Sequence, residues 1–431
     1  MGLTWQEAFI LTTTLVLLVQ GLFFSSAMLY SWKDPSTLLA VAPPRLVFGK
    51  PRRKFSLLVP ARFEEGVIKQ TILACSRINY PKDQYEVIVI TRNDDPATKE
   101  KVVEAMRECK DCDVRLLTCD ELPINKSKSL NAGLFEAKYP LVGVFDAEDE
   151  PHPDLLTAID TFLDQNPGTD VVQSGVQLVN VASTWFSAIA CLEYYFWFKS
   201  VLPLFSFLGS TPLGGNTVFF KKYALLRVGG WDEYCLTEDA EIGMRLAAAG
   251  FRIRMIYDGA LATLEETPPS SDSFVRQRTR WIQGYLQTAA KGYWAKQKSP
   301  AKRWLSLYLL LQPAVHEILA IAFVVGPAAS LFMRAPLILT YAAFLPLFFL
   351  ALQMGSMIIG LAHLKRNHRL NFPRRLYLQL VASYFPYQFL ITFSFVRAVK
   401  RILTAQTGWE KTVHYDLHRQ FLFGVNVAAG I

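Results

Sequence analysis

Four acidic residues follow one apolar segment of the chain. In "LVGVFDAEDEPHPD", Asp146, Glu148, Asp149 and Glu150 come directly after a run that predicts a buried strand. Buried carboxylates are unfavourable unless a cation or hydrogen-bond donors compensate them. Asp146 and Glu148 can both point at one hard cation such as Mg²⁺ or Mn²⁺, which takes oxygen ligands and is often shared with substrate phosphates. The alternative is that the acids stabilise the N-terminus of a helix that begins just after them.

A second acidic cluster opens a predicted helix within residues 229–250. Thr237 suits the N-cap position, and Glu238 and Asp239 fall in the first turn. A carboxylate held there can also act as a general base toward a hydroxyl group. Taken singly, the cluster favours capping, and catalysis stays open.

A third cluster, "RQRTRW", covers residues 276–281. On a helix, Gln277, Arg280 and Trp281 share one face through their i, i+3, i+4 spacing. Arginine suits phosphates, and an aromatic ring suits the apolar face of a sugar. The alternative is a membrane-surface helix whose arginines extend to the headgroups, which explains the arginines but not Gln277.

The elements that position these clusters lie between Phe55 and about Tyr257. Near-continuous apolar segments such as "FSLLVPA" and "YEVIVIT" alternate with helical stretches, which predicts a mostly parallel α/β sheet covered on both faces. Ligands of such sheets bind at the carboxyl ends of the strands. Polar residues fall at three such ends, in "ARFEE", "RNDDP" and "DAED", so one crevice can collect all three.

The composition places part of the chain in a membrane. Its 431 residues are 51% hydrophobic and carry a net charge of +8, and the basic clusters lie beside apolar runs. This arrangement is typical of lipid headgroups and the positive-inside rule, and no DNA-binding motif accompanies it. Phe9–Tyr30 is uncharged and long enough to span a bilayer, and no basic residue precedes it. We therefore expect the N-terminus outside and residue 50 onward in the cytosol, where the six cysteines stay reduced.

Three further apolar segments follow the α/β region: Trp304–Met333, Ala335–Ala362 and Leu376–Val396. If the α/β region and residues 409–412 are both cytosolic, an even number of membrane crossings must separate them. One of the three segments must then be re-entrant or interfacial. Leu376–Val396, which contains Pro386 between basic stretches, is the candidate. Residues 183–205 and 271–294 mix aromatic and charged side chains and are expected to lie along the membrane surface.

These motifs, in this order, resemble the family-2 glycosyltransferases, the membrane-bound inverting enzymes that include cellulose, hyaluronan and chitin-type synthases and ceramide glucosyltransferase. The family's D, DxD, TED and QxxRW elements are matched by "RNDDP", "DAED", residues 237–239 and residues 277–281. Lys126 in "NKSKSLNAGL" matches a family lysine, and "WEKT" (409–412) matches a later W-x-K-T element. The resemblance covers about residues 55–415, and several spaced motifs are more specific than any one.

The resemblance implies a GT-A type nucleotide-sugar-binding α/β domain inserted between transmembrane and interfacial helices. It implies an N-terminal transmembrane helix (1–50), a cytosolic GT-A domain (51–270), an interfacial helix with QxxRW (271–303) and a C-terminal transmembrane region with the W-x-K-T loop (304–431). The enzyme is expected in the plasma membrane, with membrane lipids and a UDP-sugar as partners and no nucleic acid.

The resemblance also implies the roles of individual residues. Asp239 is the expected general base with Glu238 beside it, and Asp146 and Glu148 hold Mg²⁺ or Mn²⁺ with the donor diphosphate. The remaining expected donor-site residues are Ala61, Glu64, Asp94 or Asp95, Lys126, Gln277, Arg280, Trp281, Trp409, Lys411 and Thr412, and those of the acceptor site are Gly215, Asn216 and Trp281. Two positions depart from the family pattern: Glu148 replaces the second aspartate of DxD, and "ITRNDDP" is longer than the usual turn.

The implied reaction is transfer of a sugar from a UDP-sugar with inversion, giving a β-linked product. The first hypothesis is a processive synthase of a β-linked polysaccharide, with a possible export partner. The second is a glycolipid synthase acting on ceramide or diacylglycerol, which the small number of spans keeps open. A catalytically silent membrane scaffold or transporter is a third hypothesis, and the intact acidic motifs argue against it.

Overall fold

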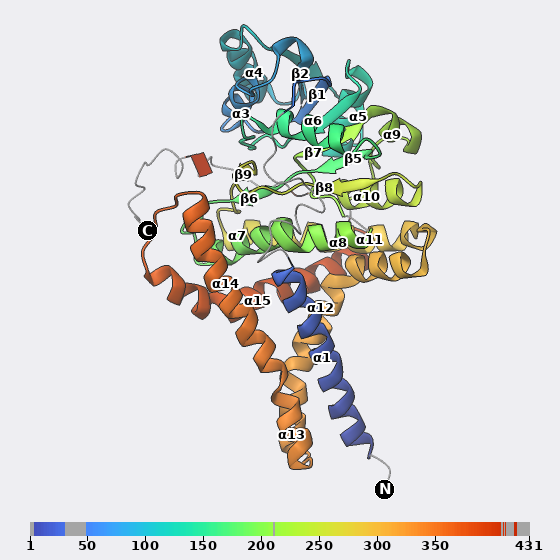
Figure 1. The fold of residues 1–431 in the computed structure, drawn as a ribbon, viewed down its shortest axis with the longest axis vertical. Coiled ribbons are helices and arrows are strands. Elements are labelled where there is room, and N and C mark those ends of the chain that lie inside the picture. Colours follow the sequence, from blue (N-terminus) through green and yellow to red (C-terminus); the bar gives the residue numbers. More distant parts are fainter. Residues whose placement is uncertain are drawn as a thin grey trace.

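The molecule has three levels: an α/β domain, a middle layer of helices, and long apolar helices that extend away from both (Figure 1). The structure, a computed structural model, describes residues 4–30, 49–209 and 212–406, together with 408, 410, 418 and 419. The α/β domain contains a seven-stranded sheet that is mixed, whereas the sequence predicts a mostly parallel one, and its architecture is GT-A-like, as the resemblance implies.

Seven strands form the main sheet, in the order β3-β2-β1-β4-β7-β5-β8. They are β1 (Phe55–Pro60), β2 (Tyr85–Thr91), β3 (Asp113–Thr118), β4 (Leu141–Val144), β5 (Val171–Gln173), β7 (Val218–Lys221) and β8 (Ile253–Met255). Strands β3, β2, β1 and β4 are parallel, as expected, with Leu57 opposite Val87 and Gly143. Strand β7 is antiparallel to both neighbours, β4 and β5. The sheet is therefore parallel in its first half and mixed in its second.

Helices cover both faces of this sheet, because alternate strand residues point to opposite sides. On one face α3 (Ile68–Ser76), α4 (Pro96–Glu108) and α6 (Leu155–Gln165) pack on side chains such as Leu57 and Val87. On the other, α5 (Lys126–Glu136), α9 (Lys222–Val228) and α10 (Glu238–Ala248) pack on Leu58 and Ile88. The 3₁₀ turn η1 (Lys82–Gln84) leads into β2.

A second, two-stranded sheet lies below the first. It pairs β6 (Val176–Leu178) with β9 (Thr263–Glu265), and Glu150 bridges to Leu264. The segment "DVVQSGVQL", which reads as one strand, is divided between β5 and β6, and β9 was not predicted. Through this bridge the acidic loop after β4 is fixed to β9.

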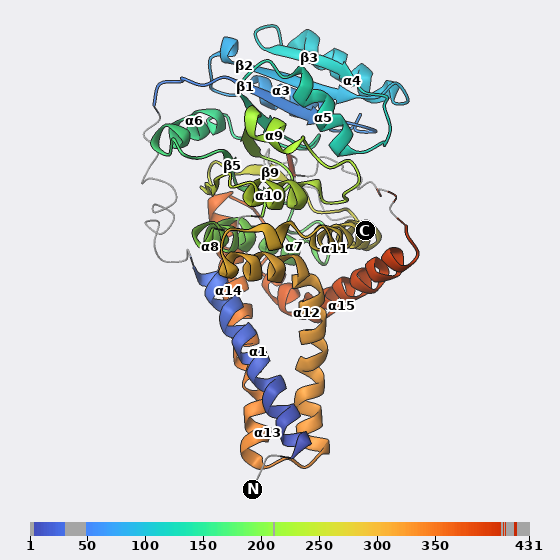
Figure 2. The same cartoon turned by 90° about the vertical axis from the view of Figure 1, so that its right-hand side faces the viewer.

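The middle layer consists of α7 (Ser187–Phe196), the π-helical turn η2 (Trp197–Val201), α8 (Leu202–Leu208), α11 (Ser271–Ala290), η3 (Tyr293–Lys296) and α15 (Arg375–Leu403). Figure 2 shows this layer between the α/β domain and the long apolar helices. Residues 183–205 were expected on a membrane surface, but most of their side chains are buried in protein. The prediction was wrong there because aromatic-rich sequences suit both a membrane surface and an internal layer.

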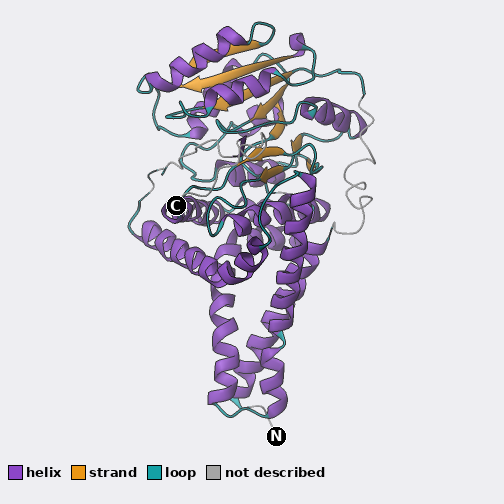
Figure 3. Ribbon diagram, turned by 90° about the vertical axis from the view of Figure 1, so that its left-hand side faces the viewer, coloured by secondary structure: helices purple, strands orange, loops and turns teal. Residues whose placement is uncertain are grey.

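Among the described residues, three helical stretches are long and apolar enough to cross a membrane: α1 (Trp5–Leu29), α12 (Pro300–Phe332) and the pair α13 (Leu337–Phe344) and α14 (Pro346–Asn367). Helix α12 continues through Pro313 and Pro327. The N-terminal end of α1 and the turn from α12 to α13 lie together, far from the α/β domain (Figures 2 and 3). Two of these stretches follow the α/β domain, so the chain after α14 returns to the domain's side.

Helix α15 is not among the three candidate spans of the described chain. It runs obliquely within the middle layer in Figure 2, on the side of the apolar helices, and packs along α11. This finding fits the expectation that Leu376–Val396 is the segment that does not span, and it leaves two candidate spans after the α/β domain.

Gly284 allows α11 to approach the N-terminus of α10. A Cβ atom added at Gly284 would lie 2.4 Å from Thr237 Oγ1 and 2.7 Å from the backbone nitrogen of Thr237. We predict that Gly284→Ala separates the two helices and lowers the free energy of unfolding by about 1–3 kcal/mol, as overpacking does. The thermal midpoint of the purified protein measures this effect. Gly66→Ala is the control, since its added Cβ meets no atom within 4 Å; equal midpoints for both variants would contradict the prediction.

Candidate active site

One cleft opens between the carboxyl ends of β1 and β4 and the middle-layer helix α11. Most of the predicted site residues line it: Ala61, Glu64, Lys126, Asp146, Glu148, Gly215, Asn216, Glu238, Asp239, Gln277, Arg280 and Trp281. Residues more than 200 positions apart in sequence thus meet in one place. Trp409, Lys411 and Thr412 lie outside the described residues.

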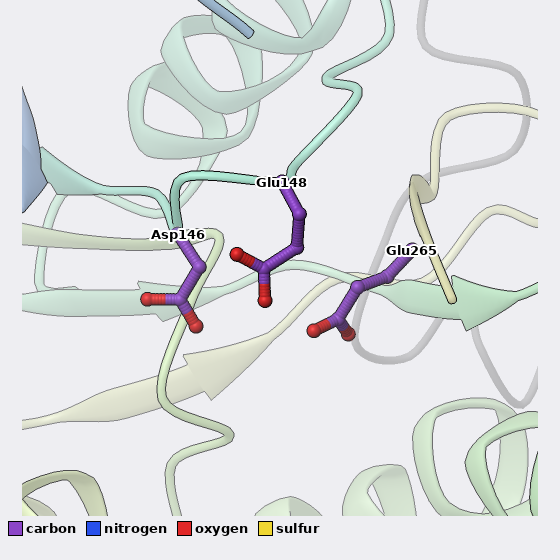
Figure 4. Close-up of side chains that lie close together, drawn as sticks. All are labelled: Asp146, Glu148 and Glu265. Atoms are coloured by element: carbon purple, nitrogen blue, oxygen red, sulfur yellow. The ribbon is translucent and has the colours of Figure 1, made fainter. Parts of the chain in front are cut away.

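Three carboxylates in this cleft form a group suited to a cation. Oxygens of Asp146, Glu148 and Glu265 all lie within 4.8 Å of one another (Figure 4). Burial, together with the nearby carboxylates Glu148, Asp149 and Asp146, raises the pKa of Glu265 well above its usual value. A divalent cation would relieve this repulsion, and three carboxylates are a donor set that Mg²⁺ and Mn²⁺ accept. The residues therefore fit the metal that the sequence predicts.

Glu265 was missed by the sequence analysis. It lies on β9, a strand of three residues, 117 positions after Glu148. The available signal was an acidic pair, Glu265 and Glu266, after the short apolar run "ALATL". Nothing in that run indicates which strand β9 pairs with.

The fourth acid of the loop, Asp149, braces its backbone. Asp149 is fully buried and accepts hydrogen bonds from the Asp146 backbone N–H and from Asn216 Nδ2, both at 2.8 Å. Burial, and then Asp146 and Glu148, raise the pKa of Asp149 well above its usual value. Asn216, expected in the acceptor site, therefore directs its amide to this loop.

The capping alternative for the acidic loop is not supported. Helix α6 begins at Leu155, has Asp154 at its N-cap and contains no acid in its first turn. The four acids precede it and face the cleft, β9 and Asn216.

Lys126 is the cation placed among these acids. Its Nζ pairs closely with Asp146, lies 3.5 Å from Glu238 and donates to the Gly215 carbonyl at 3.0 Å. Burial alone would lower the pKa of Lys126, but Asp146 and Glu238 raise it above its usual value. Lys126 is therefore charged, and it links Asp146, one of the three carboxylates of the candidate cation site, to Glu238 at the start of α10.

Asp239 occupies the first turn of α10 and faces the cleft. Burial, reinforced by Glu238, raises its pKa to about 7, while the Ala240 N–H, Lys126 and Arg280 act in the opposite direction. A Cβ on Gly215, whose φ is +84°, would lie 3.0 Å from Asp239 Oδ2, so this glycine allows the close approach. Thr237 stands at the N-cap, but its side chain makes no capping hydrogen bond. The predicted N-cap position is therefore confirmed, although the Thr237 hydroxyl takes no part in capping.

Helix α11 divides its polar residues between two sides. Gln277, Arg280 and Trp281 line the cleft, as their spacing predicts. Arg278 pairs with Glu193 of α7 at 2.5 Å and lies 4.6 Å from the Trp281 ring. It is held inside the protein, so the membrane-surface alternative is wrong for this arginine.

Tyr194 of α7 completes this corner of the cleft and was also missed by the sequence analysis. Its ring lies 6.3 Å from that of Trp281. The two rings form an aromatic wall opposite the acids. In the sequence, Tyr194 is one of several aromatics in a single helix, and nothing separates it from its neighbours.

The two aspartates of "RNDDP" have different surroundings. Asp95 is the N-cap of α4 and accepts from the backbone N–H groups of Thr98, at 3.1 Å, and Phe63. Asp94 pairs with Arg62 at 2.9 Å, which lowers its pKa. Neither aspartate lines the cleft, although Arg62 does. Asp94 therefore reaches the cleft only through its arginine partner.

Two proteins of known activity are similar to this chain in sequence. The chain is 26% identical over 334 residues to glucomannan 4-beta-mannosyltransferase 7 of Arabidopsis thaliana, covering 73% of this chain and 58% of that protein. It is 24% identical over 409 residues to the beta-monoglucosyldiacylglycerol synthase of Trichormus variabilis, covering 88% and 82%.

The fold is similar to that of the mannosyltransferase PcManGT from Pyrobaculum calidifontis, solved with GDP-Man and Mn²⁺. The TM-score is 0.58 at 18% identity, and the match covers 93% of this chain and 99% of that one. The family model described as "Glycosyltransferase like family 2" matches residues 51–284, more than half of the chain. The chain thus belongs to the family-2 glycosyltransferases.

Proposed function

We propose that the protein is a metal-dependent, inverting glycosyltransferase that moves a sugar from a UDP-sugar to a hydroxyl group at the membrane surface. The observation that carries this proposal is the single cleft in which Asp146, Glu148 and Glu265 lie opposite Asp239 and beside α11. Such a cleft can hold a diphosphate at one end and an acceptor at the other.

The donor half of the cleft suits a nucleotide diphosphate. Asp146, Glu148 and Glu265 would hold Mg²⁺ or Mn²⁺, which supplies positive charge to the departing diphosphate when bound. Lys126, Gln277 and Arg280 would bind the phosphates, since guanidinium and ammonium groups suit phosphate oxygens. The nucleoside would extend past Ala61 and Glu64 toward Asp94, and Trp409, Lys411 and Thr412 would close over the donor.

The acceptor half supplies the base. Asp239 would take the proton of the acceptor hydroxyl as its oxygen attacks the anomeric carbon, while the bond to the UDP oxygen breaks on the opposite face. Glu238 would support this role by holding Lys126 in place, at 3.5 Å. Attack from the opposite face turns an α-linked donor into a β-linked product.

For the acceptor, the geometry supports a lipid such as diacylglycerol or ceramide. The described spans α1, α12 and α13–α14 bury few of their side chains inside the protein, as lipid-facing helices do, and they number only three. One observation favours the polysaccharide first expected: Trp281 and Tyr194 form a wall on which a sugar ring could stack. With three described spans, a self-built pore is poorly supported, so the polysaccharide alternative includes an export partner.

The proposed location is the cytosolic face of the plasma membrane. The support is the pairing of three apolar stretches with basic residues on the α/β side, such as "KPRRK" after α1 and "AKR" in the first turn of α12. Two crossings after the domain bring α15 and Glu410 to the same side as the cleft. There Glu410 pairs with Arg397 at 2.6 Å and Arg401 at 3.0 Å.

Asp239→Asn tests the base. We expect transfer to fall by about 10²–10⁴-fold, as for a general base, with UDP binding nearly unchanged. In the wild type, kcat/KM should fall as the pH drops through about 7, because the carboxyl of the free enzyme then gains a proton. Ordinary turnover by Asp239→Asn, or a flat pH profile between 5 and 9, would show that this carboxylate is not the base.

Glu265→Gln tests the metal group. We expect the Mn²⁺ concentration for half-maximal transfer to rise by at least about tenfold, the lower end of losses seen for groups that only support a metal ligand. Excess chelator should stop the wild-type enzyme. Glu136→Gln, on the exposed end of α5, is the matched control; full turnover in chelator would reject the proposed cation.

Product analysis distinguishes the acceptors. The protein in lipid nanodiscs that contain diacylglycerol is incubated with a panel of UDP-sugars, and the products are identified by mass spectrometry. One or two sugars on a lipid are expected, and a ladder of many sugars would favour the polysaccharide. Trp281→Ala should impair transfer more than donor hydrolysis in either case.

A further inference from the structure

Beyond the membrane region, Arg419 lies against the acidic loop and its neighbour His418 lies near Glu266. His418 and Arg419 are buried, at 0% and 5% exposure, although they follow the end of α15 at Leu403 by 15 and 16 positions. His418 Nδ1 is 3.8 Å from Glu266, the neighbour of Glu265. The two residues therefore contact the protein on the side of the metal-type acids that faces away from the cleft.

Arg419 holds the backbone of the acidic loop. Its Nε donates to Glu150 Oε2 at 2.6 Å, and its Nη2 donates to the Asp149 carbonyl at 3.0 Å. The same Nη2 lies 3.5 Å from the Glu148 carbonyl and 3.0 Å from Thr71 Oγ1. The Thr71 hydroxyl in turn donates to the Ala147 carbonyl at 2.6 Å. One guanidinium thus fixes three successive carbonyls, one of them through Thr71.

The contact extends to the third carboxylate of the metal group. Glu150 exchanges two backbone hydrogen bonds with Leu264, at 3.0 and 3.1 Å, and Leu264 immediately precedes Glu265. Arg419 therefore acts on Glu148 through the loop and on Glu265 through Glu150. Figure 4 shows Asp146 and Glu148 on that loop, facing Glu265 across a short gap.

Arg419 does not itself enter the cleft, whose lining excludes it. Its charge is permanent and its planar fork can bind several oxygens at once, which suits a support for a loop with four acids. Lys126, by contrast, lies inside the cleft on Asp146. Lys126 thus pairs with a carboxylate inside the cleft, whereas Arg419 binds the backbone of the loop from outside it.

We propose that Arg419 is a positioning residue for the metal group: it holds residues 147–150 so that Asp146 and Glu148 meet Glu265, and it makes that group depend on the chain after α15. This inference rests on the proposed function, because it assumes that the acids hold a divalent cation.

The test is Mn²⁺ binding by the full-length protein in nanodiscs with saturating UDP, measured by electron paramagnetic resonance of free Mn²⁺. Arg419→Gln should weaken Mn²⁺ binding by about 10–100-fold, as for partners that orient metal ligands. Arg419→Lys keeps the charge without the fork and should restore binding only in part. Turnover of Arg419→Gln at saturating Mn²⁺ should return close to that of the wild type. Arg227→Gln, on the exposed side of α9, is the control and should bind as the wild type does.

Binding by Arg419→Gln within twofold of the wild type would overturn the inference. If that variant fails to fold, Thr71→Val decides, because it removes only the hydroxyl between Arg419 and Ala147. We expect it to weaken Mn²⁺ binding by about threefold or more, and unchanged binding would overturn the inference. A wild type that binds no Mn²⁺ would reject the proposed function as well, whereas tight wild-type binding with unchanged variants would reject only the role of Arg419.

Discussion

Repulsion between buried carboxylates is the constraint on which this cleft depends. Asp146, Glu148 and Glu265 lie within 4.8 Å of one another, with Asp149 buried behind them. Like charges at such distances are costly in a medium that water screens poorly. The arrangement persists because donors and cations surround it: Asn216 satisfies Asp149, and Lys126 pairs with Asp146. A bound cation would complete this compensation, so the repulsion among the carboxylates favours cation binding.

Helix α11 connects the cleft with the helices next to the membrane region. Helix α11 presents Arg280 and Trp281 to the cleft and Arg278 to α7, and it packs along α15 in the middle layer. Arg401 of α15 donates to Gln283 of α11 at 3.0 Å and pairs with Glu410. Helix α11 therefore lines the cleft on one side and packs toward the membrane helices on the other. An acceptor that reaches Asp239 from the lipid side would need to cross little of the protein.

Sequence reasoning predicted the parts of the site that depend on local structure. Asp146 and Glu148 follow a strand, Asp239 opens a helix, and Gln277 and Arg280 share a helix face, so periodicity and chain order were sufficient. Glu265 could not be predicted, because its position depends on the pairing of β9 with β6 and on the bridge from Leu264 to Glu150. Arg419 lies 270 positions beyond the loop that it contacts, and no local pattern marks it.

In the fold, too, the elements set by local sequence were predicted and those set by tertiary pairing were not. The parallel strands β1 to β4 were correctly predicted from their apolar runs, whereas the antiparallel insertion of β7 follows from tertiary pairing alone. Residues 183–205 were misplaced because aromatic side chains that suit a membrane surface also fill a layer between two parts of a protein. The candidate spans α1, α12 and α13–α14 were predicted from length and apolarity, because spanning a bilayer requires only these two properties.

The central claim is that the three carboxylates hold one divalent cation beside a nucleotide diphosphate. An experimental structure of the protein in nanodiscs with UDP and Mn²⁺ tests it most directly. We expect one Mn²⁺ coordinated by oxygens of Asp146, Glu148 and Glu265 and by the diphosphate, with Lys126 moved from Asp146 toward the phosphates. A UDP complex without an ion among these carboxylates, or with the ion held by other residues, would contradict the account.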